Sequence, residues 1–184
     1  METPILKTKD LTLRPIKLDD ALAIQKYFDN WNIIKNLTKE VPWPYPKDGA
    51  ESFLKEKALP SMDKGEALIW AITFKQKPDD LIGIIHFNFK DDERGNRGFW
   101  IAEPFWKKGL MTQAIFAVQD YLFLELGLEH IKVTNSVDNI GSRRVKEKTG
   151  AEYIGLVPQE TRSGQNKAEI WQVTRENWSK FRNI

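Results

Sequence analysis

Apolar and polar residues alternate over several short stretches of the chain, and this period of two is typical of strands with one buried face. The first stretch, Leu11–Pro15, ends in a proline, which cannot donate to a strand ladder. Further strands are predicted at 68–74, 81–89, 98–101, 131–136, 153–157 and 168–173. Because Lys77–Asp80 has the composition of a turn, 68–74 and 81–89 are expected to form an antiparallel hairpin.

Elsewhere the apolar residues recur at the spacing of a helix. One face of a long helix, which Gly127 would end, carries Met111, Ile115, Val118, Leu122 and Leu126. Shorter helices are predicted from Asp19 or Asp20 to Phe28, from Asp48 to about Ala58, from about Gly141 to Thr149 and over Trp178–Phe181. Val41–Pro46 has a proline at every second position, so it is expected to be an extended loop.

The order of these elements indicates the fold class. The polar segment 91–96 predicts a turn, and it is followed by a strand at 98–101, the long helix and a strand at 131–136. Strand, helix and strand form a βαβ unit, whose two strands should lie parallel. A chain of 184 residues favours one domain. We therefore predict a single α+β domain over residues 1–184, with a mixed sheet.

Composition excludes several kinds of site. The chain has no cysteine, which excludes disulfides and a cysteine acyl-enzyme, and its two histidines, His86 and His130, are too few to favour a metal site. A net charge of +2 is small for a protein that binds nucleic acid. No apolar run approaches the roughly 18 residues of a membrane span. Met1–Pro4 lacks the start of a signal peptide, so a cytoplasmic location is expected.

One stretch, Phe99–Thr112, leads from a strand through a tight loop into the long helix. Loop amides and the positive end of the helix would point into one small space, which suits a pyrophosphate. Lys107 and Lys108 add positive charge, and Gly109 allows the main chain to approach an anion without a Cβ. Many such junctions bind nothing, so this feature alone does not separate a phosphate site from an ordinary connection.

A second stretch, Asn139–Gly150, follows the other strand of the βαβ unit and should lie beside the first. The side chain of Asn139 can both donate and accept hydrogen bonds. Ser142 is a candidate catalytic hydroxyl. Taken alone, however, a serine at the start of a helix is more often a simple cap.

Taken together and in order, these segments resemble the GNAT superfamily of N-acetyltransferases, and most nearly the bacterial branch that acetylates the N-terminal alanine or serine of ribosomal proteins. The resemblance runs from Thr8 to about Trp178. Each motif is weak by itself, but the ordered set is specific. The matching segments are Leu11–Pro15, Pro42–Pro46, Gly49–Phe53, Leu81–Gly83, Gly98–Ile101, Phe105–Thr112, Asn139–Ser142 and Glu147–Ala151.

The resemblance implies the GNAT fold, a mixed and mostly antiparallel sheet flanked by helices, with a central pair of parallel strands that splay apart. It also implies acetyl-CoA as the cosubstrate. The pantetheine arm would pair with the strand that holds Trp100 and Ile101, Asn139 would hold the arm, and Ser142 would lie near the thioester sulfur. The pyrophosphate would be bound by the amides of Lys107, Lys108, Gly109, Leu110, Met111 and Thr112.

Three positions depart from the pattern that the resemblance leads us to expect. Lys107 stands where the family usually has glycine, and Gln113 where it usually has glutamate. Many relatives place a tyrosine seven residues after the asparagine, as proton donor to the leaving thiolate, whereas this chain has Lys146 there. The ribosomal-protein branch uses the serine instead, so Ser142 is the implied donor.

The general base and the acceptor site are less clearly defined. The resemblance places a glutamate near Glu160, which is equally a solvated loop residue, and Glu103, His86 or a water chain are the alternative bases. Trp43 and Tyr45 would form an aromatic wall of the acceptor site or, on the alternative interpretation, cover the core.

The leading hypothesis is an N-acetyltransferase that transfers acetyl from acetyl-CoA to an amine, most simply a protein or peptide N-terminus, by direct attack on the thioester. A small-molecule acetyltransferase, acting on a polyamine, an amino acid or an aminoglycoside, is an alternative. So is an acyl-CoA sensor without turnover. Neither a metal, a nucleic acid nor a membrane is expected as a partner, and the chain is expected to be a monomer or a homodimer.

Overall fold

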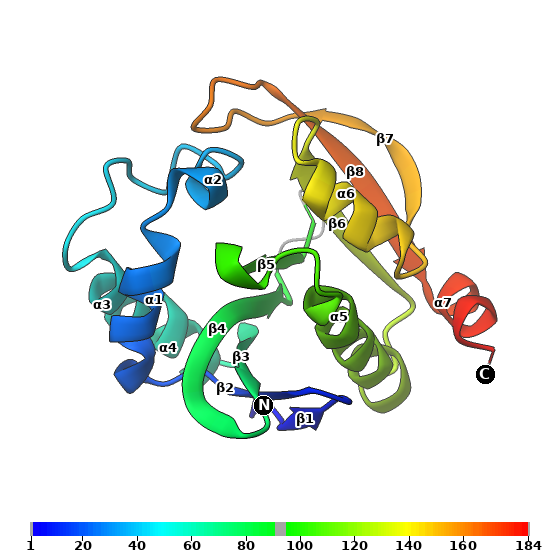
Figure 1. Cartoon of the computed structure of the whole chain (residues 1–184). Helices are drawn as coiled ribbons and strands as arrows, with labels where there is room; N and C mark the ends of the chain where they lie inside the picture. The colour runs from blue at the N-terminus through cyan, green and yellow to red at the C-terminus, as the bar shows by residue number, and fades with distance from the viewer. Residues whose placement is uncertain (1, 91–94, 184) are drawn as a thin grey trace.

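The strands form two antiparallel sheets (Figure 1). The first contains, in hydrogen-bonded order, β1 (Leu6–Lys7), β2 (Leu11–Pro15), β3 (Ala67–Phe74), β4 (Lys77–Asn88) and β5 (Arg97–Ile101). In the second, β8 (Lys167–Thr174) lies between β6 (His130–Ser136) and β7 (Glu152–Pro158). This computed structural model describes residues 2–90 and 95–183, so the turn predicted at 91–96 lies mostly outside the described part.

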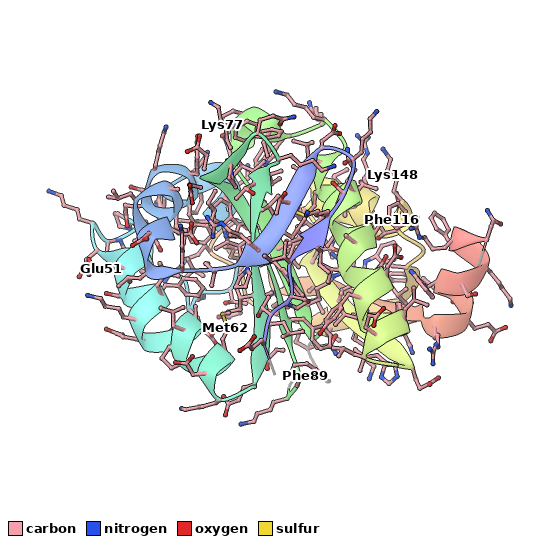
Figure 2. The ribbon with its side chains drawn as sticks, turned by 90° about the horizontal axis from the view of Figure 1, so that it is seen from below. Glu51, Met62, Lys77, Phe89, Phe116 and Lys148 are labelled. Atoms are coloured by element: carbon pink, nitrogen blue, oxygen red, sulfur yellow. The ribbon has the colours of Figure 1, made fainter. Side chains whose placement is uncertain are left out.

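Helices cover both faces of the first sheet. On one face lie α1 (Ala21–Phe28), preceded by the 3-10 turn η1 (Leu18–Asp20), and the continuous run α3 (Gly49–Phe53), η2 (Leu54–Ala58) and α4 (Leu59–Asp63). On the other lies α5 (Leu110–Asp120), which continues as η4 (Tyr121–Glu125). Figure 2 shows Glu51 and Met62 to one side of the sheet and Phe116 of α5 to the other.

The remaining helices lie around the second sheet and the loops. α6 (Ile140–Glu147) lies beside β6 and β8, and α7 (Arg175–Arg182) follows β8 (Figure 1). The short helices α2 (Trp31–Ile34) and η3 (Glu103–Phe105) are joined by side-chain hydrogen bonds. Within residues 2–90 and 95–183, no helix is long and apolar enough to span a membrane.

The strand β3 is buried on both faces and joins the two halves of the core. Leu68 and Trp70 pack with α5 in one apolar cluster, whereas Ile69 and Ala71 pack with α1, α3 and η2 in the other. Side chains alternate across a strand, so one continuous apolar run serves both layers.

The elements that the sequence predicts are present, and most strand ends lie within one residue of their predicted positions. The turn predicted at Lys77–Asp80 is wrong. The chain turns at 75–76, and β4 begins at Lys77. Phe74 pairs with Lys77 and Thr73 with Leu81, so a bulge contains residues 78–80. Pro78 is tolerated there because the ladder needs no donor from it.

The helix predicted to end near Ala58 instead continues through Pro60 to Asp63. Proline usually interrupts a helix, since it removes one hydrogen bond and its ring contacts the preceding turn. Here the wider π turn η2 lies directly before Pro60, and Leu59 N–H bonds to Leu54 O. This local widening gives the ring room, so the helix continues.

The two sheets meet at the edge strands β5 and β6. Asn96, just before β5, donates its N–H to Lys132 O at 2.9 Å, and its side-chain oxygen accepts from Lys132 N–H at 3.2 Å. Beyond this contact no ladder joins β5 and β6 in the described residues, where every strand pair is antiparallel. The splayed pair is therefore confirmed, although the βαβ unit joins two sheets rather than two paired strands.

Candidate active site

The free edge of β5 presents main-chain groups to the gap beside β6. Ala102 N–H bonds to Ile82 O at 2.8 Å, and Ile101 lies opposite Gly83 in the ladder with β4. Hydrogen-bonded and non-bonded pairs alternate along an antiparallel ladder. The main-chain groups of Phe99 and Ile101 therefore point away from β4 and toward the gap, as an added extended segment would require.

Trp100 lies between these two residues and has the opposite orientation. Its main chain faces β4, and its ring packs against Phe28 with 5.2 Å between ring centroids. Of the two strand residues predicted to bind the cosubstrate, Ile101 therefore has its main chain at the gap, whereas Trp100 belongs to an aromatic cluster on the other face.

The loop between β5 and α5 is folded back onto the strand. Trp106 donates its indole N–H to Ile101 O at 2.7 Å, and Phe105 N–H bonds to Ala102 O at 2.9 Å. Lys107 has a left-handed main chain with φ of 62°, and Gly109 has φ of 74°. A left-handed main chain explains why glycine is favoured at the position of Lys107.

The N-terminus of α5 opens at this loop. Gly109 is its N-cap, and no side chain caps the first turn. The first N–H groups of a helix have no partner within the helix, so the amides of Leu110, Met111 and Thr112 are available to a ligand. A Cβ added to Gly109 would have no atom within 4 Å, which shows free space beside the main chain.

α6 begins in a different way from the sequence prediction. Asn139 is its N-cap, and the Asn139 side-chain oxygen accepts from Ser142 N–H at 3.0 Å. Ser142 therefore lies in the first turn and does not cap the helix. Its hydroxyl accepts a hydrogen bond from Lys146 Nζ at 2.7 Å, one turn further along.

Two buried cationic residues lie behind this hydroxyl. Lys146 is 1% exposed and Arg97, on β5, is 4% exposed. In the described part of the chain, none of the three guanidinium nitrogens of Arg97 has a hydrogen-bond partner. Burial, and next the charge of Arg97, lower the pKa of Lys146 well below 10.5. Burial lowers the pKa of Arg97 to about 10.

A partly buried ion pair anchors α6 to the second sheet. Arg143 binds Glu169 of β8 through two guanidinium nitrogens, and Asn135 of β6 donates to the same carboxylate at 2.9 Å. Burial acts to raise the pKa of Glu169, but the hydrogen bonds from Arg143 and Asn135 outweigh it and the pKa is lowered. The carboxylate therefore stays charged and fixes the helix that carries Ser142.

Aromatic side chains cover the face near the predicted acceptor site. The rings of Phe28 and Tyr45 lie 5.2 Å apart, and those of Trp31 and Trp43 lie 5.1 Å apart. Trp43 is 39% exposed, whereas Tyr45 is partly buried and burial raises its pKa to about 12. Tyr45 thus covers the core, and Trp43 keeps part of its ring exposed.

The three candidate bases lie in different surroundings. Glu160 is exposed and pairs with Lys39 at 2.9 Å, and this hydrogen bond lowers its pKa. Glu103 accepts hydrogen bonds from Asn30 and Asn32, which lower its pKa. The ring of His86 lies over Gly98; the dense packing around it lowers its pKa although solvent reaches the side chain.

The loop that carries Glu160 is bound to the loop before Trp43. Arg162 donates to the main-chain oxygens of Val41 and Lys39, and Thr38 and Thr161 form an isolated strand bridge. Two segments far apart in the sequence therefore form one wall near the predicted acceptor site.

The sequence motifs do not point to Arg97 as a member of the site, and they single out Lys146 only as the residue at the position of the relatives' tyrosine. Arg97 shares a strand face with Phe99 and Ile101 by simple alternation, so its inward position was visible in the pattern. Two hollows, of about 440 and 490 Å³, lie elsewhere, beside β1 and α5 and beside α1 and Phe105. No described group of three or more acidic or histidine side chains is arranged to hold a metal.

The chain is similar in sequence to a known domain family and to several known proteins. The acetyltransferase (GNAT) domain family matches residues 10–152. YoaA of Bacillus subtilis, described as an uncharacterised N-acetyltransferase, is 31% identical over 165 residues, which are 85% of this chain and 87% of that protein.

Solved structures share the fold at low sequence identity. RimJ of Mycobacterium smegmatis, solved in complex with CoA-disulfide, superposes with a TM-score of 0.81 at 18% identity, over 96% of this chain and 91% of its own. The ribosomal-protein-S5-alanine acetyltransferase of Vibrio fischeri gives 0.78 at 17% identity, over 95% and 98%. The family match covers most of the chain, and the chain therefore belongs to the GNAT family of N-acetyltransferases.

Proposed function

We propose that this protein binds acetyl-CoA in the gap between β5 and β6 and transfers the acetyl group to an amine, with a protein or peptide N-terminus as the preferred acceptor. One observation carries the proposal. The edge of β5 that has no partner strand, the open N-terminus of α5, which follows β5, and α6, which follows β6 and carries Ser142, border one gap (Figure 1).

Each part of the gap suits one part of acetyl-CoA. The first-turn amides of α5, with the exposed Lys107 and Lys108, would bind the pyrophosphate. The edge of β5 would pair with the amides of the pantetheine arm. Asn139 accepts a hydrogen bond through its oxygen, which leaves its NH₂ group to hold the arm.

The reaction begins with the acceptor as a free amine. An α-amine has a pKa of about 8 and a lysine amine of about 10, so a general base must remove a proton at neutral pH. Attack on the thioester carbonyl makes an oxyanion, toward which the N–H of Ile101 would donate a hydrogen bond. The C–S bond then breaks, and Ser142 gives its hydroxyl proton to the sulfur.

The proposed acceptor class rests on the surface beside the gap and on the relatives. The exposed faces of Trp31 and Trp43 form an apolar wall, and the bound loops at Arg162 form a second wall, which suits an extended peptide end. Of the two solved structures described above, one is RimJ and the other is named as a ribosomal-protein-S5-alanine acetyltransferase. Glu160, paired with Lys39 on the second wall, is the proposed base.

A thiol-release assay tests this function. Acetyl-CoA would be mixed with the protein and with a panel of N-terminal peptides, together with spermidine, free amino acids and an aminoglycoside. We expect CoA release with peptides that begin with alanine or serine. CoA release with the small amines alone would show that the acceptor is a small molecule and not a peptide. Binding of acetyl-CoA without CoA release on any amine would favour a sensor.

A further inference from the structure

Lys146 occupies an unusual place for a lysine. It is 1% exposed, and its Nζ lies 2.7 Å from Ser142 Oγ and 5.5 Å from the centre of the Phe99 ring. A buried cation is normally paired with a carboxylate. The nearest carboxylate that acts on it, Glu169, is already bound by Arg143 and Asn135.

The hydrogen bond fixes the direction of the Ser142 hydroxyl. An amine of either charge can donate to Ser142 Oγ, and a hydroxyl that accepts on one side directs its own proton elsewhere. The N–H of Ser142 donates to the side chain of Asn139, and this hydrogen bond fixes the main chain that carries the hydroxyl. The Ser142 proton would then be directed away from Lys146, toward the gap in which we place the thioester.

We propose that Lys146 is a positioning residue for acetyl transfer: it directs the Ser142 hydroxyl toward the thioester sulfur, and it returns a proton to Ser142 after that hydroxyl has protonated the leaving thiolate. This inference rests on the proposed function.

The step balances as follows. When the C–S bond breaks, its electron pair stays on sulfur, and the Ser142 hydroxyl proton forms the S–H bond. The ammonium proton of Lys146 passes to Ser142 Oγ, which leaves a neutral amine. Water later returns a proton to Lys146, and the acceptor nitrogen gives one proton to the general base. The sum is one amide and one thiol from one amine and one thioester.

The groups around Lys146 favour this release of a proton. Arg97 faces it from β5 without a partner among the described residues, and Glu169 faces it from β8 with its charge shared with Arg143. Burial and the Arg97 charge make the ammonium form unfavourable, so Lys146 is a stronger acid than a lysine in water. Loss of the proton relieves the repulsion between two buried cations.

A double-mutant cycle tests the inference. Turnover, the KM for acetyl-CoA and the pH profile would be measured for Lys146→Met, Ser142→Ala and the double variant. We expect Lys146→Met to lower kcat by about tenfold to a hundredfold, no more than the lower end of the range for a general acid, while KM changes less than about twofold. In the Ser142→Ala background, Lys146→Met should have almost no further effect.

The pH profile separates a proton-transfer role from a packing role. Wild-type kcat should fall as the pH rises through the lowered pKa of Lys146, because the proton to be returned is then absent, and Lys146→Met should lose this limb. Lys148→Met is the matched control, since Lys148 lies two residues later and is exposed (Figure 2). It should leave all three quantities unchanged.

A measurement without substrate checks the buried amine itself. The pKa of Lys146 is lower in the folded state than its ordinary value of 10.5. Its contribution to the folding stability of the protein is therefore lost as the pH falls from 10.5 through the pKa of the folded state. Wild-type stability relative to Lys146→Met should therefore rise toward pH 10.5. Unchanged kcat and pH profile in Lys146→Met, or effects that multiply in the double variant, would overturn the inference. Failure of wild type to acetylate any amine would instead overturn the proposed function on which it rests.

Discussion

At the scale of single residues, the main-chain conformation of Lys107 is unusual for a residue with a side chain. Lys107 has φ of 62°, a conformation that costs about 1 kcal/mol or more for a residue with a Cβ. Its side chain is exposed, so no packing contact explains this strain. Its position in the loop before α5 suits the binding of phosphate.

Lys107→Gly should therefore stabilise the unliganded protein by about 1 kcal/mol or less, since relief of strain is partly offset by a more flexible unfolded chain. It should also weaken acetyl-CoA binding, more strongly at low salt, because one cation is lost. Chemical denaturation and calorimetry at two salt concentrations measure both effects. Lys108→Gly is the control for the strain, since positive φ is not found at Lys108, and it should not stabilise the protein.

The proposed base can be tested through its ion pair. Lys39 lowers the pKa of Glu160, and a base must be deprotonated, so turnover should be lost as the pH falls through that pKa. Lys39→Met should move this acidic limb to higher pH, because the pKa of Glu160 then rises toward its ordinary value. Glu160→Gln should remove the limb and lower kcat by about a hundredfold. If the acidic limb of the pH profile is unchanged in both variants, the general base is Glu103, His86 or water.

At the scale of elements, the sequence predicted strands well where a local signal marks their ends. β2 ends at Pro15 as expected. The errors occur where tertiary structure changes a local rule. A bulge admits Pro78 into β4, and a π turn before Pro60 lets a helix continue to Asp63. Neither irregularity leaves a periodic signal in the sequence.

The N-terminus of α5 carries a prediction of its own. Gly109→Val should weaken acetyl-CoA binding by about tenfold or more, because the new side chain would fill the free space where we place the pyrophosphate. The left-handed φ of 74° also makes valine unfavourable there, so the protein should lose some stability.

A second glycine separates these two effects. Gly127 has φ of 69° and equally free space, but it follows η4, beyond the opposite end of the same helix. Gly127→Val should cause a similar loss of stability and leave the affinity for acetyl-CoA unchanged in calorimetry. Equal affinities for both valine variants would place the pyrophosphate elsewhere.

At the scale of the whole molecule, the two sheets are joined by hydrogen bonds between Asn96 and Lys132, and the edges of β5 and β6 border the gap in which we place acetyl-CoA. The sequence predicted the strands that border this gap, and the family resemblance implied their splay. It did not predict that Arg97 and Lys146 are buried side by side behind Ser142, since charged residues are rarely buried and neither lies near the other in the sequence. The proposed acceptor site is also not set by one motif, because its walls would come from loops that are joined at Arg162.

Calorimetric titration of the protein with acetyl-CoA tests the central claim most directly, because it needs no knowledge of the acceptor. The account predicts saturable binding with one acetyl-CoA per chain, which weakens in Gly109→Val and persists in Gly127→Val. Absence of binding to the folded wild-type protein would contradict the claim that the gap between β5 and β6 is an acetyl-CoA site.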